Sequence, residues 1–300
     1  MSWATTAVLS SVLYAAVNII DSHLLSRRMP GLRSFLLPIA VVHSLFALVV
    51  FFLFPLPANL GVKPVLAIVI AGVLRIIAAV IMLHNLRREE VSLVIPVVYS
   101  YPIFVAIIAM PLLGEVLSAL QWVAVVIVVV GTLLVSAKKM PTGLNGWLAK
   151  FFPLLLFAGL LFAVADVATK YALNYMSFWS AFSLNTFTMS GITLLFAARP
   201  EVVKQLIAIK PRKTFVWLIV VDEALTLVAV VLWYWAMTLG PVSLVSTILG
   251  SRPAFVALFA LLLSQTLPQF LLNSTSKGLL ALRLFATAMI VGGITIIYLT

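Results

Sequence analysis

Four charged residues interrupt long apolar runs of this 300-residue chain, and their types allow them to do chemistry. Arg75 and Arg252 each lie about ten residues inside an apolar run, which is about 15 Å of helix. The adjacent acids Asp222 and Glu223 lie about eight residues inside another, or about 12 Å. An arginine at that depth can bind an anionic group, and neighbouring carboxylates in a low dielectric tend to share a proton. An arginine paired with Asp222 or Glu223 could instead only join two helices, so the sequence leaves both interpretations open.

Helical spacing places other polar and aromatic side chains beside these charges. At about 100° per residue, one stripe of the run that carries the acids consists of Asp222, Thr226, Ala229 and Trp233, bordered by Glu223 and Tyr234. In the first apolar run, Tyr14 and Asn18 share one face, and Asp21 either continues that face or caps the helix. Both faces are expected to line a polar cavity, while Trp233 and Trp235, near the end of their run, belong either to that cavity or to the aromatic belt at the membrane interface.

Two tyrosines, Tyr99 and Tyr101, come immediately before Pro102. A proline removes one helical hydrogen bond and leaves a carbonyl free to face water or a ligand, so the neighbouring side chains can line a cavity. Because the two tyrosines point to different faces of a helix, we expect only one of them in the cavity.

Three other charged residues are expected to have structural roles. Asp166 and Lys170 are spaced i, i+4, which favours an ion pair near a helix end. Glu115 follows Gly114 in a turn between two apolar runs and is predicted to be a helix-end group.

The composition excludes a water-soluble domain, because 64% of the residues are hydrophobic and 9% are charged. A spanning helix needs about 20 mainly apolar residues. Ten such segments are predicted, which makes the chain an all-α membrane protein. They lie near residues 3–21, 34–54, 65–86, 91–112, 118–136, 151–173, 178–198, 214–238, 243–264 and 281–299.

One stretch of the chain occurs twice, 151 residues apart. The segments VSLVIPVVYSYPIFVAIIA from Val91 and VSLVSTILGSRPAFVALFA from Val242 are identical at ten of nineteen positions, and Tyr101 aligns with Arg252. A weaker match aligns the segments from Leu13 and Leu161. The chain is therefore predicted to consist of two repeats, residues 1–140 and 141–300. Because each repeat holds five helices, the second must enter the membrane from the opposite side, as in inverted-repeat transporters.

The basic residues are distributed unequally between the two sides of the membrane. Fifteen lie in or beside the loops after the odd-numbered segments, against Lys63 and Lys170 on the other side. By the positive-inside rule, both termini face outward and the basic loops are cytoplasmic. This distribution explains the net charge of +11 without nucleic acid as a partner.

Several classes of protein are excluded by what the sequence lacks. The chain has no cysteine and three scattered histidines, so no disulfide and no metal cluster is expected. It has no phosphate-binding glycine loop and no plausible catalytic triad, so neither an enzyme nor an ATP-driven pump is expected, and no cofactor.

The segment PIFVAIIAMPLLGEVLSALQWVAVVIVVVGTLLV, from Pro102 to Val135, resembles the EamA domain of the drug/metabolite transporter superfamily. That domain combines a fourth-helix proline, a Gly-Glu loop and a glycine in the fifth helix. The second repeat keeps Pro253 and the pair Gly292 and Gly293, but has Gln265 and Thr266 in place of Gly-Glu. The resemblance implies two five-helix units and transport. It also implies cytoplasmic termini, in conflict with the charge distribution, which we follow here.

These observations predict a secondary transporter in an inner or plasma membrane. It would move a small polar or amphoteric metabolite, of the amino acid or organic anion class, by alternating access driven by protons or by exchange. The alternative is a flippase for a polyprenyl phosphate or a lipid-linked sugar. The expected partners are the small-molecule substrate, the lipid bilayer and, as a candidate coupling ion, the proton. The predicted substrate-binding residues are Arg75, Arg252, Asp222, Glu223, Tyr99, Tyr101, Trp233, Asn18 and Tyr14.

Overall fold

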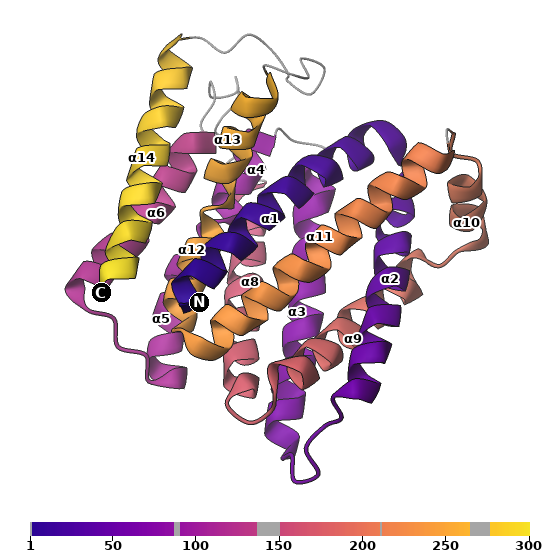
Figure 1. The fold of residues 1–300 in the computed structure, drawn as a ribbon, viewed down its shortest axis with the longest axis horizontal. Coiled ribbons are helices and arrows are strands. Elements are labelled where there is room, and N and C mark those ends of the chain that lie inside the picture. Colours follow the sequence, from indigo (N-terminus) through magenta and orange to yellow (C-terminus); the bar gives the residue numbers. More distant parts are fainter. Residues whose placement is uncertain (1, 87–90, 137–150, 211, 265–276) are drawn as a thin grey trace.

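A computed structural model describes residues 2–86, 91–136, 151–210, 212–264 and 277–300, which form helices joined by short connections (Figure 1). The predicted boundary between the repeats, at residues 140 and 141, and the predicted departure at Gln265 and Thr266 lie outside these residues. The helices of the first half are α1 (Trp3–His23), the π-helix η1 (Leu24–Arg28), α2 (Leu32–Leu53), α3 (Val62–Leu86), α4 (Val91–Val98), α5 (Pro102–Leu113) and α6 (Ala119–Ser136). Those of the second half are α8 (Phe152–Leu173), α9 (Phe178–Ala197), α10 (Pro200–Ile207), α11 (Arg212–Leu239), α12 (Val242–Gly250), α13 (Arg252–Ser264) and α14 (Lys277–Leu299).

Seven stretches of the described residues are long and apolar enough to cross a membrane. They are α1, α2, α3, α8, most of α11, the stretch Val242–Phe259 through α12 and α13, and most of α14. Helices α5 and α6 are shorter and apolar, and α9 passes the same test only together with α10, to which it is bent by 90°. These helices confirm a multi-pass, all-helical membrane protein.

Two of the predicted spans are broken in the middle. The span from residue 91 is divided between α4 and α5 at Tyr99–Tyr101, and the span from residue 243 is divided between α12 and α13 at Ser251. Each break lies beside a proline, Pro102 or Pro253, whose missing amide hydrogen cannot continue the helical ladder. The repeated prolines therefore break the helix at equivalent places in the two halves.

The most extensive helix packing joins the first half of the chain to the second. Helix α3 packs on α8, α2 on α9, α1 on α11 and α6 on α14, while α5 packs on both α12 and α8. In Figure 1, α6 and α14 lie side by side at one edge, and α1 runs alongside α11. The core between the halves holds fully buried large side chains such as Phe182, Tyr234 and Leu244.

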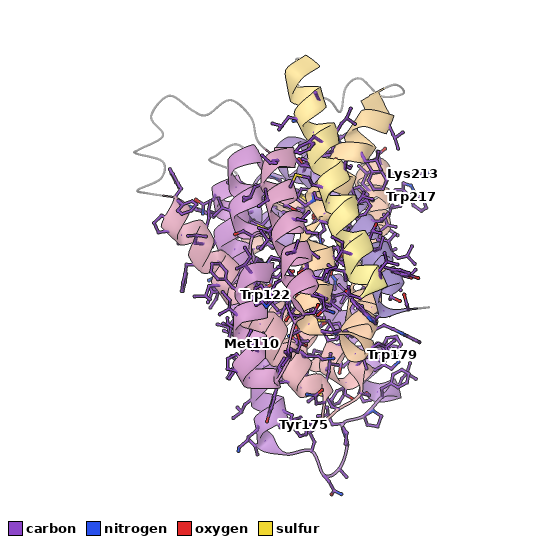
Figure 2. The ribbon with its side chains drawn as sticks, turned by 90° about the vertical axis from the view of Figure 1, so that its left-hand side faces the viewer. Met110, Trp122, Tyr175, Trp179, Lys213 and Trp217 are labelled. Atoms are coloured by element: carbon purple, nitrogen blue, oxygen red, sulfur yellow. The ribbon has the colours of Figure 1, made fainter. Side chains whose placement is uncertain are left out.

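Both chain termini lie at the same end of the molecule. The Trp3 ring lies against Gly240 in the α11–α12 turn, and Figure 1 marks the two termini at a similar level of the bundle. Figure 2 shows Tyr175, at the α8–α9 connection, towards one end of the helices, and Lys213, at the start of α11, towards the other. We call the end that contains the termini and the α11–α12 turn the terminal end, and the opposite end, which holds η1 and α10, the basic end.

Candidate functional site

A cavity of about 330 Å³ lies between the two halves of the molecule. Helices α1, α2, α3, α8, α9 and α11 supply most of its walls, and the broken spans contribute the residues at their breaks. All nine predicted site residues line it. They are Tyr14, Asn18, Arg75, Tyr99, Tyr101, Asp222, Glu223, Trp233 and Arg252. The structure therefore brings together side chains from positions 14 to 252, while their role in binding stays a prediction.

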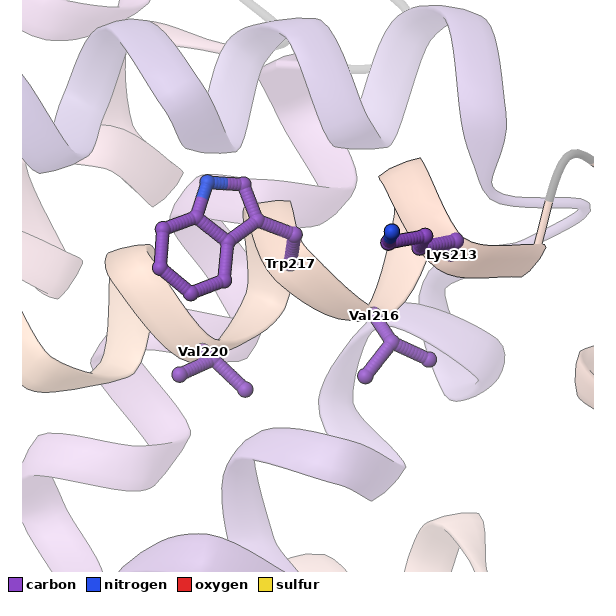
Figure 3. A pocket seen from close by; sticks show the side chains of 4 residues that line it. All are labelled: Lys213, Val216, Trp217 and Val220. Atoms are coloured by element: carbon purple, nitrogen blue, oxygen red, sulfur yellow. The ribbon is translucent and has the colours of Figure 1, made fainter.

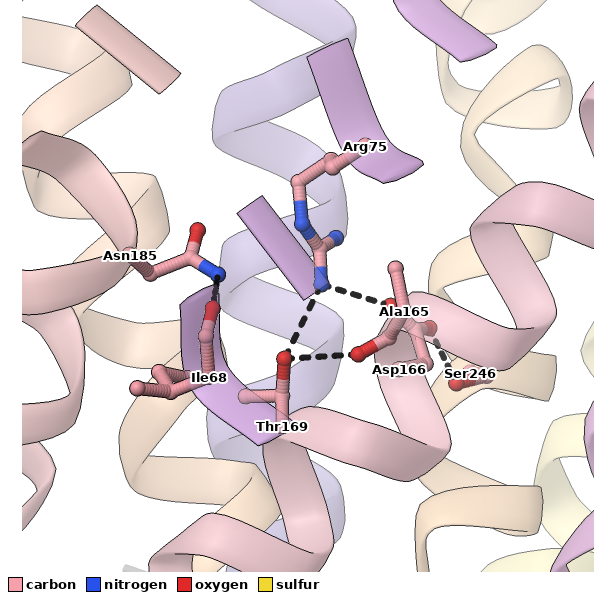
Figure 4. Close-up of polar contacts among 7 residues, drawn as sticks. All are labelled: Ile68, Arg75, Ala165, Asp166, Thr169, Asn185 and Ser246. Carbon is pink, nitrogen blue, oxygen red and sulfur yellow. Dashed lines mark hydrogen bonds and ion pairs between the residues drawn. The ribbon is translucent and has the colours of Figure 1, made fainter. Parts of the chain in front are cut away.

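Arg75 belongs to a polar network that joins helices from both halves (Figure 4). Its Nη2 lies 3.0 Å from Oδ1 of Asp166 and donates to the Thr169 hydroxyl over 3.3 Å. The Ser246 hydroxyl donates to the second oxygen of Asp166 over 2.7 Å. The Arg75 guanidinium also lies 4.4 Å from the centroid of the Trp233 ring. Asp166 is 1% exposed, so this pair neutralises a buried carboxylate and links α3 to α8, α11 and α12.

The predicted ion pair between Asp166 and Lys170 is wrong. The Lys170 ammonium instead donates to the backbone carbonyls of Met237 over 2.6 Å and Gly240 over 2.9 Å. These carbonyls belong to the end of α11, where the last turn of a helix lacks intrahelical partners and favours a cation. The tertiary contact therefore prevails over the i, i+4 spacing.

Arg252 has a different environment from Arg75. Its guanidinium carbon lies 3.9 Å from the centroid of the Tyr14 ring, and its Nη1 donates weakly to the Tyr99 hydroxyl over 3.5 Å. Its Nε is buried without a hydrogen-bond partner among the described residues. Within the described part of the chain, no carboxylate lies within ion-pair distance of Arg252. Its positive charge therefore faces the cavity without a counter-ion from these residues.

Asp222 and Glu223 do not pair with either arginine, so the ion pairs considered between these residues are absent from the described structure. The Asp222 carboxyl lines the cavity together with that of Asp21, and Oε2 of Glu223 lies 3.3 Å from Nδ1 of His43. Of the two interpretations of Asp21, the structure supports the first, because its side chain lines the cavity with those of Tyr14 and Asn18. Two like charges about 4 Å apart repel by about 4 kcal/mol at an effective dielectric constant of about 20. Two adjacent buried acids, with Asp21 beside them in the cavity lining, therefore favour a bound proton or a cationic ligand.

Tyr99 and Tyr101 both line the cavity, although we expected only one of them to do so. The expectation assumed a continuous helix, whereas the chain leaves the α-helix at Tyr99–Tyr101 and the 100° spacing does not apply there. The two tryptophans near the end of α11 lie in different environments. Trp233 is buried in the cavity wall at 5% exposure, while Trp235 is 48% exposed on the outside of the bundle.

Several cavity residues were not predicted from the sequence. His43 and Asp166 belong to this group, as does a polar face of α9 made of Asn185, Thr186, Ser190 and Thr193. Thr186, Ser190 and Thr193 are spaced i, i+4 and i+7, a periodicity that could have identified this face. His43 is a single histidine in an apolar helix, and nothing in its local sequence distinguishes it from a buried core residue.

A second hollow, of about 500 Å³, lies on the outer face of α11 and is lined by Lys213, Val216, Trp217 and Val220 (Figure 3). It is a surface depression near the basic end, with one charged group and an otherwise apolar lining. Among the described residues, no group of three or more histidines, cysteines or acids could hold a metal ion. The cavity between the halves is therefore the candidate functional site.

Comparisons with known proteins agree with this architecture. No curated protein matches the chain in sequence. A solved crystal structure has the same fold with a TM-score of 0.66 and 18% identity, over 99% of this chain and 95% of the other. Residues 1–137 match the model of the EamA-like transporter family. Together with the apolar helices, this match supports an integral, multi-pass membrane protein. Residues 1–137, slightly less than half of the chain, are thus similar to the EamA-like transporter family, as their motifs predicted.

Proposed function

We propose that this protein is a secondary transporter that moves a small polar or amphoteric metabolite, of the amino acid or organic anion class, by alternating access. The observation that carries the proposal is Arg252, a buried cation that faces the cavity and has no ion-pair partner among the described residues. A guanidinium binds carboxylate or phosphate through two parallel hydrogen bonds, which makes an anionic group the natural ligand. Arg75 is already paired with Asp166 and has a structural role.

The charge distribution along the cavity supports an amphoteric substrate. Arg252, Tyr14 and Tyr99 form a cationic and aromatic region near the helix breaks. Asp21, Asp222 and Glu223 lie closer to the basic end, since Asp21 is near the end of α1 and the α11 acids are in its first half. A substrate with an anionic and a cationic group could contact both regions. A volume of about 330 Å³ is near the lower limit for small-molecule sites, which favours a small solute over a lipid-linked sugar.

Ten spanning segments in two inverted repeats are part of this proposal. Three of the ten predicted spans do not qualify as membrane-spanning helices by length and composition alone. They are the span formed by α4 together with α5, the span of α6, and the span of α9. Exchanging the repeats converts the α1–α11 contact into the α8–α3 contact and leaves the α2–α9 and α6–α14 contacts unchanged, as a pseudo-twofold axis requires. Equivalent residues also meet in equivalent pairs. Arg252 lies over Tyr14, and Tyr101 lies beside Phe162 with ring centroids 6.2 Å apart.

The proposed orientation has the basic end in the cytoplasm and the terminal end outside, in an inner or plasma membrane. The distribution of lysines and arginines supports it through the positive-inside rule. The chain has no cysteine, so single cysteines at positions 2 and 205 can be labelled separately from each side of the membrane. Labelling of position 2 from the outside alone, and of position 205 from the inside alone, is expected. The reverse pattern would refute the orientation.

Transport can be tested with purified protein in liposomes and a panel of labelled amino acids and organic anions. We expect saturable uptake of at least one solute by the wild type and its loss in Arg252→Met. Arg33→Met is the matched control, because Arg33 also lies over an aromatic ring, Phe196 at 4.8 Å, but is outside the cavity lining. Uptake that survives in Arg252→Met would overturn the anion site. A complete absence of uptake in the wild type would count against the proposed function.

A further inference from the structure

Four titratable groups from three helices gather in the part of the cavity towards the basic end. Asp21 comes from α1, His43 from α2, and Asp222 and Glu223 from α11. Asp21 and Asp222 both line this part of the cavity, and Nδ1 of His43 lies 3.3 Å from Oε2 of Glu223. We call these four residues the acid cluster.

The cluster contains a buried carboxylate oxygen that no donor reaches. Asp222 is 2% exposed, and its Oδ1 has no hydrogen-bond partner among the described residues although the side chain lines the cavity. An ionised carboxylate can only accept hydrogen bonds, and a buried charge without a donor is costly, so protonation is favoured there. The structure therefore presents a buried acceptor on which a proton can be placed.

His43 can extend this proton-binding group. Its Nδ1 lies 3.0 Å from the carbonyl oxygen of Ile39, which can only accept, so Nδ1 carries a hydrogen in this arrangement. The imidazole takes up a second proton at its other nitrogen when it becomes charged. A charged His43 would attract an ionised Glu223, whereas protonation of Glu223 would weaken that attraction.

The charged groups that face the cluster from the other walls of the cavity do not neutralise it. Arg75 on α3 is paired with Asp166 on α8, and Arg252 at the start of α13 lies over Tyr14. Helix α9 presents neutral polar side chains. They are Asn185, Thr186, Ser190 and Thr193. In the described structure, His43 is thus the one basic side chain within ion-pair distance of these acids.

We propose that Asp21, His43, Asp222 and Glu223 form a proton-binding site, distinct from the anion site at Arg252, through which transport is coupled to a proton gradient. This inference rests on the proposed function for its coupling role, but proton binding itself does not depend on it. On binding, the proton forms an O–H bond with a carboxylate oxygen of the cluster, and on release it returns to water. No other reactant is involved.

The position of the cluster gives the proton a way to affect the cavity. Helices α2 and α11 pack little on each other, whereas the equivalent pair in the other repeat, α9 and α3, is extensively packed. The α3–α9 contact includes Gly72, where an added Cβ would lie 2.8 Å from Thr188. The His43–Glu223 contact therefore spans the weaker of the two equivalent interfaces. Its electrostatic strength depends on protonation, so proton exchange would change how firmly α2 and α11 are held together.

Infrared difference spectroscopy of the purified protein tests proton binding without any transport assay. At neutral pH we expect the C=O stretch of a protonated carboxyl group, titrating with pH and lost or shifted in Asp21→Asn and Asp222→Asn. Ser190→Ala is the matched control, because Ser190 lines the same cavity and does not titrate. A wild-type spectrum without this band, or one unchanged in both variants, would overturn the proton site.

A second experiment tests coupling in liposomes, with a solute that the wild type transports. Asp222→Asn and Glu223→Gln should remove the dependence of uptake on the pH gradient, so that any uptake that remains has the same rate with and without the gradient. Gradient-driven uptake that persists in both variants, or wild-type uptake that follows a sodium gradient instead, would overturn the coupling role. If the infrared band titrates but the wild type moves no solute, the proposed function and the coupling role fail while the proton site stands.

Discussion

The guanidinium of Arg252 lies over the ring of Tyr14, with its central carbon 3.9 Å from the ring centroid. In the aligned repeats, the residue one turn after Tyr14 is Asn18, and the residue one turn after its counterpart Phe162 is Asp166. Asp166 holds Arg75, whereas Asn18 has no charge with which to hold Arg252. The divergence of this one position is consistent with one arginine being structural and the other being available to a ligand.

Asn18→Asp should therefore convert the anion site into an internal ion pair. A carboxylate one turn from Tyr14 would compete with an anionic substrate for Arg252, so transport should be lost without loss of folding. Uptake in liposomes and thermal unfolding in detergent measure the two effects. Asn18→Ser is the control, because it changes the size of the side chain without adding charge. Normal uptake in Asn18→Asp would mean that the substrate does not need the free charge of Arg252.

Arg75→Met should destabilise the protein more than Arg252→Met does. Removing Arg75 leaves Asp166 buried with an unpaired charge, a change that costs about 3–5 kcal/mol in other proteins. Arg252 has no ion-pair partner among the described residues, so its loss should leave the melting temperature nearly unchanged. Thermal unfolding in detergent compares the two variants. The double variant Arg75→Met with Asp166→Asn should recover much of the loss, and equal destabilisation by both single variants would contradict this division of roles.

The parts of the site that the sequence predicted depend on local periodicity or on the cost of a charge in lipid. The Tyr14 and Asn18 face, the α11 stripe and the two buried arginines follow from helical spacing and composition alone, and the structure places all of them in one cavity. The partners of these charges were predicted less well. Local spacing allows Asp166 to pair with Lys170 in its own helix, but helix packing places Arg75 of another helix beside it.

Broken helices set another limit to prediction from the sequence. The prolines indicated a disturbance near residues 102 and 253, but the side-chain directions of Tyr99 and Tyr101 depend on the conformation at the break. His43 is recognisable as a site residue only when α2 and α11 are placed side by side, because its partner Glu223 is 180 residues away in the sequence.

Glu115→Ala should weaken the terminal end of the molecule. The Glu115 carboxylate accepts hydrogen bonds from the backbone amides of Val242 over 2.6 Å and Ser243 over 3.1 Å, and from the Ser243 hydroxyl over 2.6 Å. It therefore caps the N-terminus of α12 from the turn after α5, where Gly114 ends that helix with φ of 70°. Loss of such a cap costs about 1–2 kcal/mol. Thermal unfolding should show a clearly lower melting temperature for Glu115→Ala and a smaller decrease for Glu115→Gln. An unchanged melting temperature in both variants would mean that this cap contributes no stability.

Adjacent glycines in α14 should respond oppositely to the same substitution. A Cβ added at Gly293 would lie 2.6 Å from Cγ2 of Val128 and 3.2 Å from the carbonyl oxygen of Ala124, both on α6. Gly293→Ala should force α6 and α14 apart at a cost of about 1–3 kcal/mol. An added Cβ at Gly292 has no neighbour within 4 Å, so Gly292→Ala should be neutral or stabilise the helix by up to about 1 kcal/mol. Melting temperatures of the two variants in the same detergent test this difference. If both lowered the melting temperature equally, close packing of α6 on α14 at Gly293 would not be the cause.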